Sequence, residues 1–128
     1  MQSIFYKPKD GWAADFIPFY SNGRFRLFYL HDWRDPANHG EGTPWYQIST
    51  ENFINFMEHG EMLPRGGRNA QDLYVFTGCV IEADGLYHIF YTGHNPYFRQ
   101  QNRPEQGVMH AVSNDLEKWT KLEEDTFY

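Results

Sequence analysis

The sequence predicts an all-β fold made of two successive four-stranded units, each with the strand content of one β-propeller blade. The first observation is an internal repeat, and the second is that no stretch sustains the apolar period of a long helix. The third is that aromatic residues make up 19% of the 128 residues, because flat rings favour strands. We expect one partial propeller domain over 1–128, with blades at about 12–63 and 73–128.

Each half of the repeat opens with a strand, a tight turn and a second strand. The turns are Asn22-Gly23 and Asp84-Gly85, and such dipeptides favour type I′ hairpins because both central residues need positive φ. A strand in which aromatic residues alternate with others follows each turn. The first two strands of each blade are therefore predicted to form a β-hairpin.

The similarity continues through a third strand, a short polar turn and a last strand. This turn begins at Ser49 in the first half and at Ser113 in the second. The loops 33–44 and 93–107 follow the second strand of their blades. The first is rich in Asp, Asn, Gly and Pro, and the second carries Pro96, Pro104 and several Gln and Asn. Loops in equivalent positions lie at the same end of a propeller, so we expect these two to share one rim.

Two blades alone leave lateral apolar faces uncovered. Blades stack because a single blade cannot bury those faces. The sequence therefore predicts one of two partners for this chain, either further C-terminal blades or other copies in a homo-oligomer.

The charge and hydropathy of the chain exclude several classes of partner. The net charge is −6 and the basic residues form no stripe, which argues against nucleic acid. No stretch approaches the length of a membrane span, and the first residues lack the apolar core of a signal peptide. We expect no membrane partner and a cytoplasmic location, or a secreted one if a leader has been trimmed.

Cysteine and histidine usage predicts no disulfide, no metal and no cofactor. The single cysteine, Cys79, lies in an apolar run and is expected to be a small buried hydrophobe. Two histidines, His88 and His110, are expected to face outward from their strands. No spacing typical of a metal site relates these two histidines to the other three candidates, which are His39, His59 and His94.

Three short segments resemble the glycoside hydrolases of the β-fructosidase type, which include invertases and levanases and form family 32. Gly11-Trp12-Ala13-Ala14-Asp15 resembles the opening W-x-N-D-P-N-G block of that family. Phe76-Thr77-Gly78-Cys79 resembles its F-S-G-S segment, and the stretch 111–119 resembles S-x-D-x-x-x-W. The resemblance implies the N-terminal portion of a five-bladed propeller that hydrolyses β-fructosides or related glycosides, with an oligo- or polysaccharide as substrate.

The resemblance also implies roles for individual residues. Asp15 is implied to be the nucleophile, and the alternative is an aspartate that closes a turn before the strand. Trp12 in the opening block and Phe76 and Thr77 are implied to contact the sugar. Trp45 falls near a sugar-stacking tryptophan of the family, and its alternative role is packing between blades.

Three further polar positions have open interpretations. His31 and Asp32 end the first hairpin, where they either contact substrate hydroxyls or anchor a loop. Asp72 precedes an apolar strand and either binds a sugar hydroxyl or an arginine, or leads into the strand. An Arg-Asp-Pro triplet at 34–36 matches a family motif in the wrong blade, and we interpret it as a coincidence of the rim loop.

The chain departs from the family pattern at several positions. Ala14 stands where the family has asparagine, and Leu30 stands where it has glutamine. The general acid of these enzymes lies in a later blade, and glycoside hydrolysis needs two carboxyl groups. We therefore expect a glycosidase fragment that is inactive alone. The alternative is a non-catalytic carbohydrate-binding blade module that oligomerises.

Overall fold

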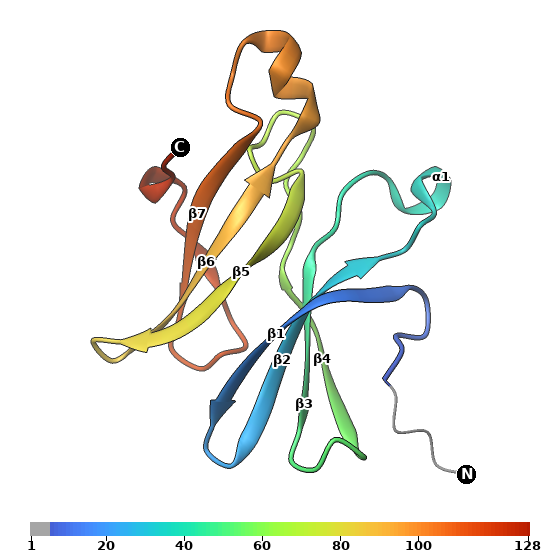
Figure 1. Ribbon diagram of the computed structural model, residues 1–128, viewed down its shortest axis with the longest axis vertical. Helices are drawn as coiled ribbons and strands as arrows, with labels where there is room; N and C mark the ends of the chain where they lie inside the picture. Colours follow the sequence, from blue (N-terminus) through green and yellow to red (C-terminus); the bar gives the residue numbers. More distant parts are fainter. Residues whose placement is uncertain (1–5) are drawn as a thin grey trace.

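The computed structural model describes residues 6–128, which form two four-stranded antiparallel sheets (Figure 1). Each sheet is a simple meander, with the order β1-β2-β3-β4 in one and β5-β6-β7-β8 in the other. The prediction of an all-β chain with two blade-like units is confirmed. The strands are β1 (Trp12–Ser21), β2 (Arg24–Asp32), β3 (Trp45–Thr50), β4 (Phe56–Leu63), β5 (Tyr74–Ala83), β6 (Leu86–His94), β7 (Gln106–Ser113) and β8 (Thr120–Lys121).

The helical elements are short and lie outside the sheets. They are α1 (Pro36–His39) and the 3₁₀ turns η1 (Pro96–Gln101) and η2 (Glu123–Asp125). The loops that carry α1 and η1 extend toward the same end of the molecule, while the hairpin turns lie toward the other (Figure 1). No helix within residues 6–128 has both the length and the apolar character needed to cross a membrane.

Both predicted hairpin turns form where the dipeptides stand. The flanking pairs are Ser21 with Arg24 and Ala83 with Leu86. The turn residues Asn22, Gly23, Asp84 and Gly85 have φ of 51°, 77°, 52° and 77°. Positive φ at both central residues matches the right-handed twist of the strands, which is why these dipeptides predict the turn so well.

The polar turn of the first blade begins one residue later than predicted. In the second blade the Ser113 hydroxyl accepts hydrogen bonds from the backbone N–H groups of Asp115 and Leu116, at 3.1 and 3.0 Å. In the first blade it is the hydroxyl of Thr50, not of Ser49, that accepts from the N–H groups two and three residues on, at 3.2 and 2.9 Å. Neighbouring side chains on a strand point to opposite faces, so only Thr50 faces the turn.

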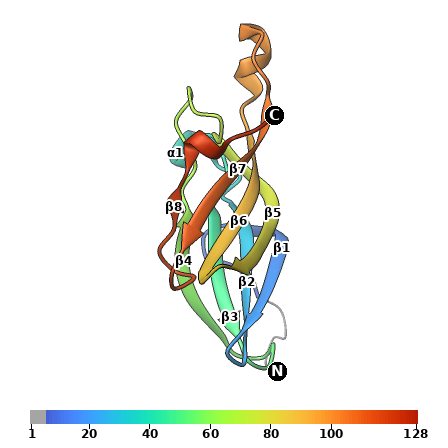
Figure 2. The same cartoon turned by 90° about the vertical axis from the view of Figure 1, so that its left-hand side faces the viewer.

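The main core lies between the two sheets, which pack face against face (Figure 2). Phe28 and Trp45 from the first sheet meet Ile89 and Tyr91 from the second, and each is at most 1% exposed. Trp119 is partly buried and packs edge-on against Phe28 with ring centroids 5.9 Å apart. Burying these rings contributes favourably to holding the blades together.

Equivalent residues of the two blades face opposite neighbours. Leu27 and Ile89 each lie three residues beyond the first pair of their hairpin. Ile89 packs in the core between the sheets, whereas Leu27 belongs to a second cluster on the other face of the first sheet. The free face of the first blade therefore corresponds to the face by which the second blade sits on the first.

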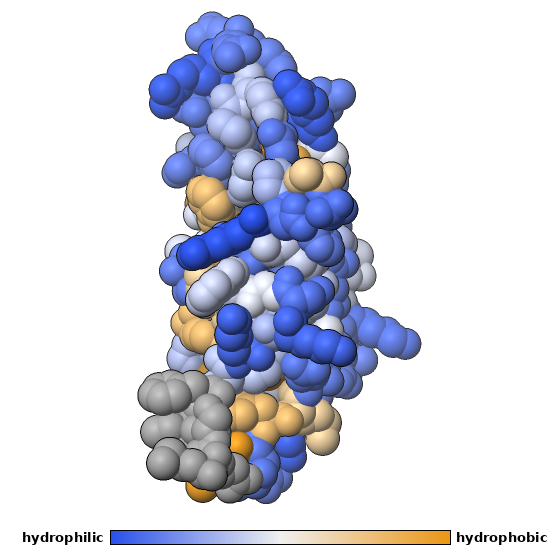
Figure 3. Space-filling model, turned by 90° about the vertical axis from the view of Figure 1, so that its right-hand side faces the viewer, coloured by the Kyte–Doolittle hydropathy of each residue, from blue (hydrophilic) through white to orange (hydrophobic). Residues whose placement is uncertain are grey.

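That free face carries a groove, which we call the apolar groove. It has a volume of about 590 Å³ and leaves side chains such as Phe16 and Phe53 each 45% exposed. Apolar side chains gather at the lower end of the molecule in Figure 3. The residues that line the apolar groove are Tyr6, Phe16, Pro18, Phe25, Leu27, Ile48, Phe53 and Phe56.

The free face of the second blade explains two differences from the sequence predictions. Cys79 is exposed rather than buried, because it alternates with the buried Val80 and points away from the first sheet. His88 and His110 lie on this outer face as expected, but they are partly buried. Their rings stack at 5.2 Å, and Nδ1 of His88 lies 2.9 Å from Nε2 of His110.

Candidate active site

Asp15 lies in a β-bulge of β1. Ala14 pairs with Leu30 and Ile17 pairs with Phe28, so β1 has one more residue than β2 over this stretch. Asp15 has a φ of 50°, in the left-handed region, and its side chain is exposed. Bulges beside active sites re-aim a side chain out of the strand alternation, and aspartate tolerates the left-handed backbone better than most residues. A turn-closing role does not describe this position, because strand pairing continues on both sides of it.

The second blade repeats the bulge at the equivalent place. The β5–β6 register shifts between Val75 and Gly78, so the extra residue falls at Phe76 and Thr77. Counted back from the hairpin turns, Thr77 corresponds to Asp15, and its side chain is likewise exposed. Since β1 and β5 are the strands that contact each other across the blades, the two bulges lie on neighbouring strands. Asp15 and the Phe76-Thr77 segment are therefore at equivalent positions of adjacent strands.

Phe76 is held by partners on both sides. Its ring stacks on His94 with centroids 4.8 Å apart, and its carbonyl accepts a hydrogen bond from Trp45 Nε1 at 2.9 Å. This bond ties β5 of the second blade to β3 of the first at the level of the bulges. The backbone beside Thr77 is therefore fixed by a contact between blades.

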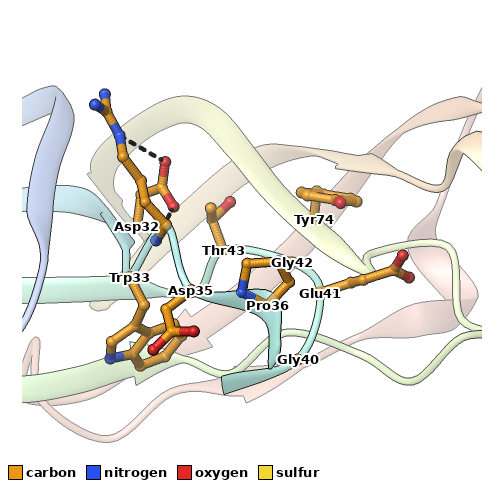
Figure 4. Close-up of a pocket in the computed structure, with 10 residues that line it drawn as sticks. Asp32, Trp33, Asp35, Pro36, Gly40, Glu41, Gly42, Thr43 and Tyr74 are labelled. Carbon is orange, nitrogen blue, oxygen red and sulfur yellow. Dashed lines mark hydrogen bonds and ion pairs between the residues drawn. The ribbon is translucent and has the colours of Figure 1, made fainter. Parts of the chain in front are cut away.

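A polar pocket of about 280 Å³ lies in the rim loop between β2 and β3, with one wall from β5 (Figure 4). Figure 4 shows the loop residues facing Tyr74, which belongs to the second blade. Its polar and aromatic lining includes Asp32, Trp33, Arg34, Asp35, Glu41 and Tyr74. Carboxylates and aromatic rings in one concave site are suited to a polyhydroxylated ligand.

The Arg-Asp-Pro triplet builds this loop. The backbone N–H of Arg34 donates to Asp32 Oδ1 at 2.9 Å, and Arg34 Nε lies 3.6 Å from Asp32 Oδ2. Asp35 Oδ2 accepts from Asn38 Nδ2 at 2.8 Å, and Pro36 is the first residue of α1. The triplet therefore shapes the rim, which agrees with its interpretation as a loop feature.

Two predicted sugar-binding residues are enclosed and need correction. Trp45 has 0% exposed surface, so no sugar can stack on its ring, and packing between blades describes its position. Asp72 is 2% exposed, and its charged partner among the described residues is a lysine rather than an arginine. It forms an ion pair with Lys121 Nζ at 2.6 Å and accepts a hydrogen bond from the Tyr91 hydroxyl at 3.0 Å. Burial and the nearby Asp72 carboxylate raise the pKa of Tyr91.

The structure separates His31 from Asp32. Asp32 lines the rim pocket, whereas His31 is 1% exposed and lines a different cavity on the free face of the first blade. Consecutive strand residues point to opposite faces, so the pair does not act at one site. Burial lowers the pKa of His31, although the Asp10 carboxylate opposes this shift.

Trp12 stands at the start of β1 with its side chain 47% exposed. The ammonium of Lys7 lies 4.2 Å and the guanidinium of Arg34 lies 4.9 Å from its ring centroid. Cations over an indole face interact favourably with its π system. The Trp12 ring thus links the N-terminal segment to the rim loop.

Sequence reasoning missed a hydrogen-bonded chain that joins the blades. His59 Nε2 lies 2.7 Å from Ser49 Oγ, and His59 Nδ1 lies 2.8 Å from Glu117 Oε1 of the second blade. The three residues are distant in sequence, so no local pattern indicates the chain. Ser49 is 0% exposed and cannot reach a substrate, so this arrangement is an inter-blade contact rather than a nucleophile with its base.

No group of three or more His, Cys, Asp or Glu side chains within residues 6–128 is arranged to hold a metal ion. Carboxylates, hydroxyls and aromatic rings are the groups found at the positions described above. Asp15 at its bulge and the rim pocket are the features that suit a carbohydrate.

Comparison with known proteins agrees with this arrangement. Residues 5–127 match the model of the glycosyl hydrolases family 32 N-terminal domain. A β-fructofuranosidase of Schwanniomyces occidentalis matches with 17% identity and a TM-score of 0.72 over 94% of this chain and 25% of that one. A GH32 β-fructofuranosidase of Bombyx mori matches with 22% identity and a TM-score of 0.70 over 93% of this chain and 24% of that one.

A GH43 β-xylosidase/α-arabinofuranosidase from a compost microbial metagenome also matches, with 15% identity and a TM-score of 0.68 over 96% of this chain and 38% of that one. No curated protein matches the sequence. At these identities the structural matches show the fold alone, which is that of propeller blades. The chain spans about a quarter of the length of the fructofuranosidases it matches.

Proposed function

Because the chain belongs to glycosyl hydrolase family 32, we propose that it carries the nucleophile of a glycosidase acting on β-fructosides or related glycosides. The observation that carries this proposal is the exposed Asp15 in a β-bulge of β1, where Asp15 is the last residue of the block that resembles the family's opening motif. In this role Asp15 attacks the anomeric carbon of the sugar. A carboxylic acid from another blade protonates the leaving oxygen.

The second blade supports the same site. The Phe76-Thr77 bulge on the neighbouring strand places backbone groups and the exposed Thr77 hydroxyl at the equivalent level. The rim pocket adds Asp32, Asp35 and Tyr74 above the strand ends. We propose that Thr77 contacts the sugar at the reacting carbon and that the rim pocket contacts a more distant part of the substrate.

Turnover by this chain alone is expected to be absent. Hydrolysis needs a nucleophile and an acid on opposite sides of the scissile bond, and the family resemblance assigns the acid to a later blade. The chain spans about a quarter of its fructofuranosidase matches, so the proposed activity belongs to an assembly with further blades.

The test is complementation. The chain is co-expressed with the later blades of a family 32 β-fructofuranosidase, and sugar release from sucrose and levan is measured. We expect hydrolysis with the unchanged chain and none with Asp15→Asn, which keeps the size and backbone preference of the side chain. The matched control is Asp35→Asn in the rim loop, for which turnover persists with a raised KM.

Hydrolysis that survives Asp15→Asn would refute the nucleophile assignment. Equal loss of kcat in Asp15→Asn and Asp35→Asn would also refute it, because the rim pocket is not at the reacting carbon in this proposal. Circular dichroism of both variants shows that the sheets are intact.

A second candidate is a non-catalytic sugar-binding module that associates through its blade faces. One observation favours it. The free face of the first blade is equivalent to the face that the second blade uses to pack against the first, so a second copy could pack there in the same way. In this case Asp15→Asn leaves sugar binding mostly intact. Calorimetric titration of the unchanged chain and the Asp15→Asn variant with fructose distinguishes binding that needs the carboxylate from binding that does not.

A further inference from the structure

A hydrogen-bonded pair of histidines lies on the free face of the second blade. His88 comes from β6 and His110 from β7, and their facing nitrogens, Nδ1 and Nε2, are 2.9 Å apart. The outer nitrogen of each ring also has a partner. Nε2 of His88 lies 3.3 Å from the Ala83 carbonyl oxygen, and Nδ1 of His110 lies 2.7 Å from Asp125 Oδ2. The rings are thus the middle of a chain of three hydrogen bonds, which runs from the β5–β6 hairpin to η2.

The number of protons in this chain follows from its two ends. The Ala83 carbonyl oxygen can only accept a hydrogen bond, and so can the ionised carboxylate of Asp125. Each of the three hydrogen bonds needs one proton. Two neutral imidazoles carry only two protons on their four nitrogens, so one of the three contacts would be left without a proton. The geometry therefore requires a third proton.

The third proton resides on the imidazoles. A protonated Asp125 would also complete the count, but an imidazole is a stronger base than a carboxylate. With the proton on the rings, the pair carries one positive charge, and Asp125 carries the opposite charge. The contact between His110 and Asp125 is then an ion pair as well as a hydrogen bond, which strengthens it.

The surroundings of His110 favour this charge. The Phe90 ring lies parallel to the His110 ring, with centroids 4.5 Å apart and 2° between the planes. The face of an aromatic ring attracts a cation. The His110 side chain is 12% exposed, so water solvates the charge only in part, and Phe90 and Asp125 supply the remaining stabilisation.

Asp125 is the acid that acts most directly on the pair. In the described part of the chain, residues 6–128, its carboxylate is the one within ion-pair distance of either ring. The cation of β8, Lys121, pairs with Asp72 instead. The other titratable groups on the neighbouring elements are Cys79 in β5, Asp84 in the hairpin turn, and Glu123 and Glu124 in η2.

We propose that the His88–His110 pair is a proton switch, which holds one proton beyond those of two neutral imidazoles at pH 7 and releases it to solvent at higher pH. With the proton bound, all three hydrogen bonds form, and the pair joins η2 to the β5–β6 hairpin across β6 and β7. When the proton leaves, Asp125 keeps its bond, because hydrogen bonds to charged groups are the stronger ones. The contact between His88 and the Ala83 carbonyl is the one that is lost.

The switch gives the free face of the second blade a charge that depends on pH. It involves neither Asp15 nor the rim pocket, and it requires no sugar. Failure of this proposal or of the glycosidase proposal therefore leaves the other standing.

The experiment uses the whole chain at pH 7, labelled with ¹⁵N at histidine. The ¹⁵N shift distinguishes a protonated ring nitrogen from a bare one, and each ring is assigned through its own backbone amide. We expect the four nitrogens of the pair to carry three protons in sum. A sum of two would overturn the proposal, because both imidazoles are then neutral. A sum of four would also overturn it, because the contact between the rings then has no acceptor.

A substitution at Asp125 tests the coupling to η2. In Asp125→Asn the amide oxygen can still accept from His110, but no charge balances the pair. We expect the proton affinity of the pair, measured by pH titration of the ring signals, to fall about fivefold, as for a partly exposed ion pair. The matched control is Glu124→Gln, which removes a charge from the same turn and should lower the affinity less than about twofold. Equal effects of the two variants would overturn the proposal, because the pair would then respond only to the overall charge of the turn.

Discussion

The backbone of Asp15 limits which residues can occupy its position. With a φ of 50° it lies in a region where a Cβ crowds the following carbonyl, at a cost of roughly 1–2 kcal/mol for an ordinary residue. Asparagine and aspartate reduce that cost by local hydrogen bonds, and glycine has none of it. The position is therefore held by a residue type that combines a carboxylate with tolerance of this conformation.

We predict that Asp15→Ala unfolds at lower urea concentration than Asp15→Gly, by about 1 kcal/mol in the free energy of unfolding. On an ordinary strand position glycine would be the less stable of the two. Equilibrium unfolding followed by tryptophan fluorescence measures the difference. If alanine equals or exceeds glycine, the bulge does not impose this backbone, and Asp15 lacks the orientation that the proposed chemistry requires.

His31 gives the molecule a dependence of stability on pH. Burial lowers its pKa in the folded state below the ordinary value of 6.5, so the unfolded chain binds the proton more readily. The contribution of His31 to stability is therefore complete above pH 6.5. It is lost as the pH falls from there toward the folded-state pKa.

We predict a larger fall in the urea midpoint between pH 7.5 and 5.5 for the unchanged chain than for His31→Gln. Other titrating groups contribute equally to both chains, so the difference between them isolates His31. A pH dependence that is identical in the two chains would mean that His31 is not enclosed.

At the scale of strands and turns, short sequence patterns predicted the features whose geometry depends only on neighbouring residues. Asn22-Gly23 and Asp84-Gly85 specify their turns because only the turn residues themselves need unusual φ. The bulges at Asp15 and at Phe76-Thr77 have no such dipeptide, because their cause is pairing with β2 and β6. The sequence could therefore identify Asp15 as a candidate nucleophile, but it could not predict the β-bulge that exposes its side chain.

The face of each strand was harder to predict than the strand itself. A run such as Val75–Ile81 is apolar along most of its length, because blades bury both faces in a stack. Nothing in such a run says which face is covered, and so Cys79 was assigned to the core. The same limit applies to Trp45, whose ring could be placed in the site or in the packing only once its neighbours were known.

The chain Ser49–His59–Glu117 is a contact between elements of different blades. Ser49 is fully buried, and its hydroxyl depends on His59 for a partner. We predict that His59→Ala lowers the free energy of unfolding by roughly 1–3 kcal/mol, the cost of leaving a buried polar group unpaired. Glu117→Gln, which can still accept from the imidazole, should lower it by less.

Urea unfolding of the two variants checks this prediction. A fluorophosphonate probe provides a second readout, because it labels accessible activated serines. We expect no label on the folded chain, since Ser49 has no exposed surface. Labelling at Ser49 would show instead that the blades open enough to expose a working hydroxyl.

For the whole molecule, the stacking of blades explains both the core and the exposed apolar surface. The second blade buries Ile89, Tyr91 and Leu116 against the first, and the equivalent positions of the first blade are Leu27, Tyr29 and Phe53. Of these, Phe53 is 45% exposed and lines the apolar groove. Contiguous apolar patches of this kind mark interaction surfaces in soluble proteins.

We therefore predict that the isolated chain self-associates through the apolar groove. Light scattering on a sizing column should give a mass above the 15.2 kDa of a single chain, increasing with protein concentration. Phe53→Glu, which places a charge in the groove, should lower the mass toward that of one chain. Met57→Glu is the matched control, because Met57 is 54% exposed but does not line the groove.

The light-scattering result decides between the two proposed functions, because they differ in what covers the free face of the first blade. Association that Phe53→Glu abolishes and Met57→Glu preserves means that one copy can occupy the blade position on another. The sugar-binding module that oligomerises then becomes the stronger candidate. A chain that stays monomeric at all concentrations means that its blade faces do not complement each other. Further blades of a glycosidase then remain the partner, and the complementation test with Asp15→Asn is the experiment that follows.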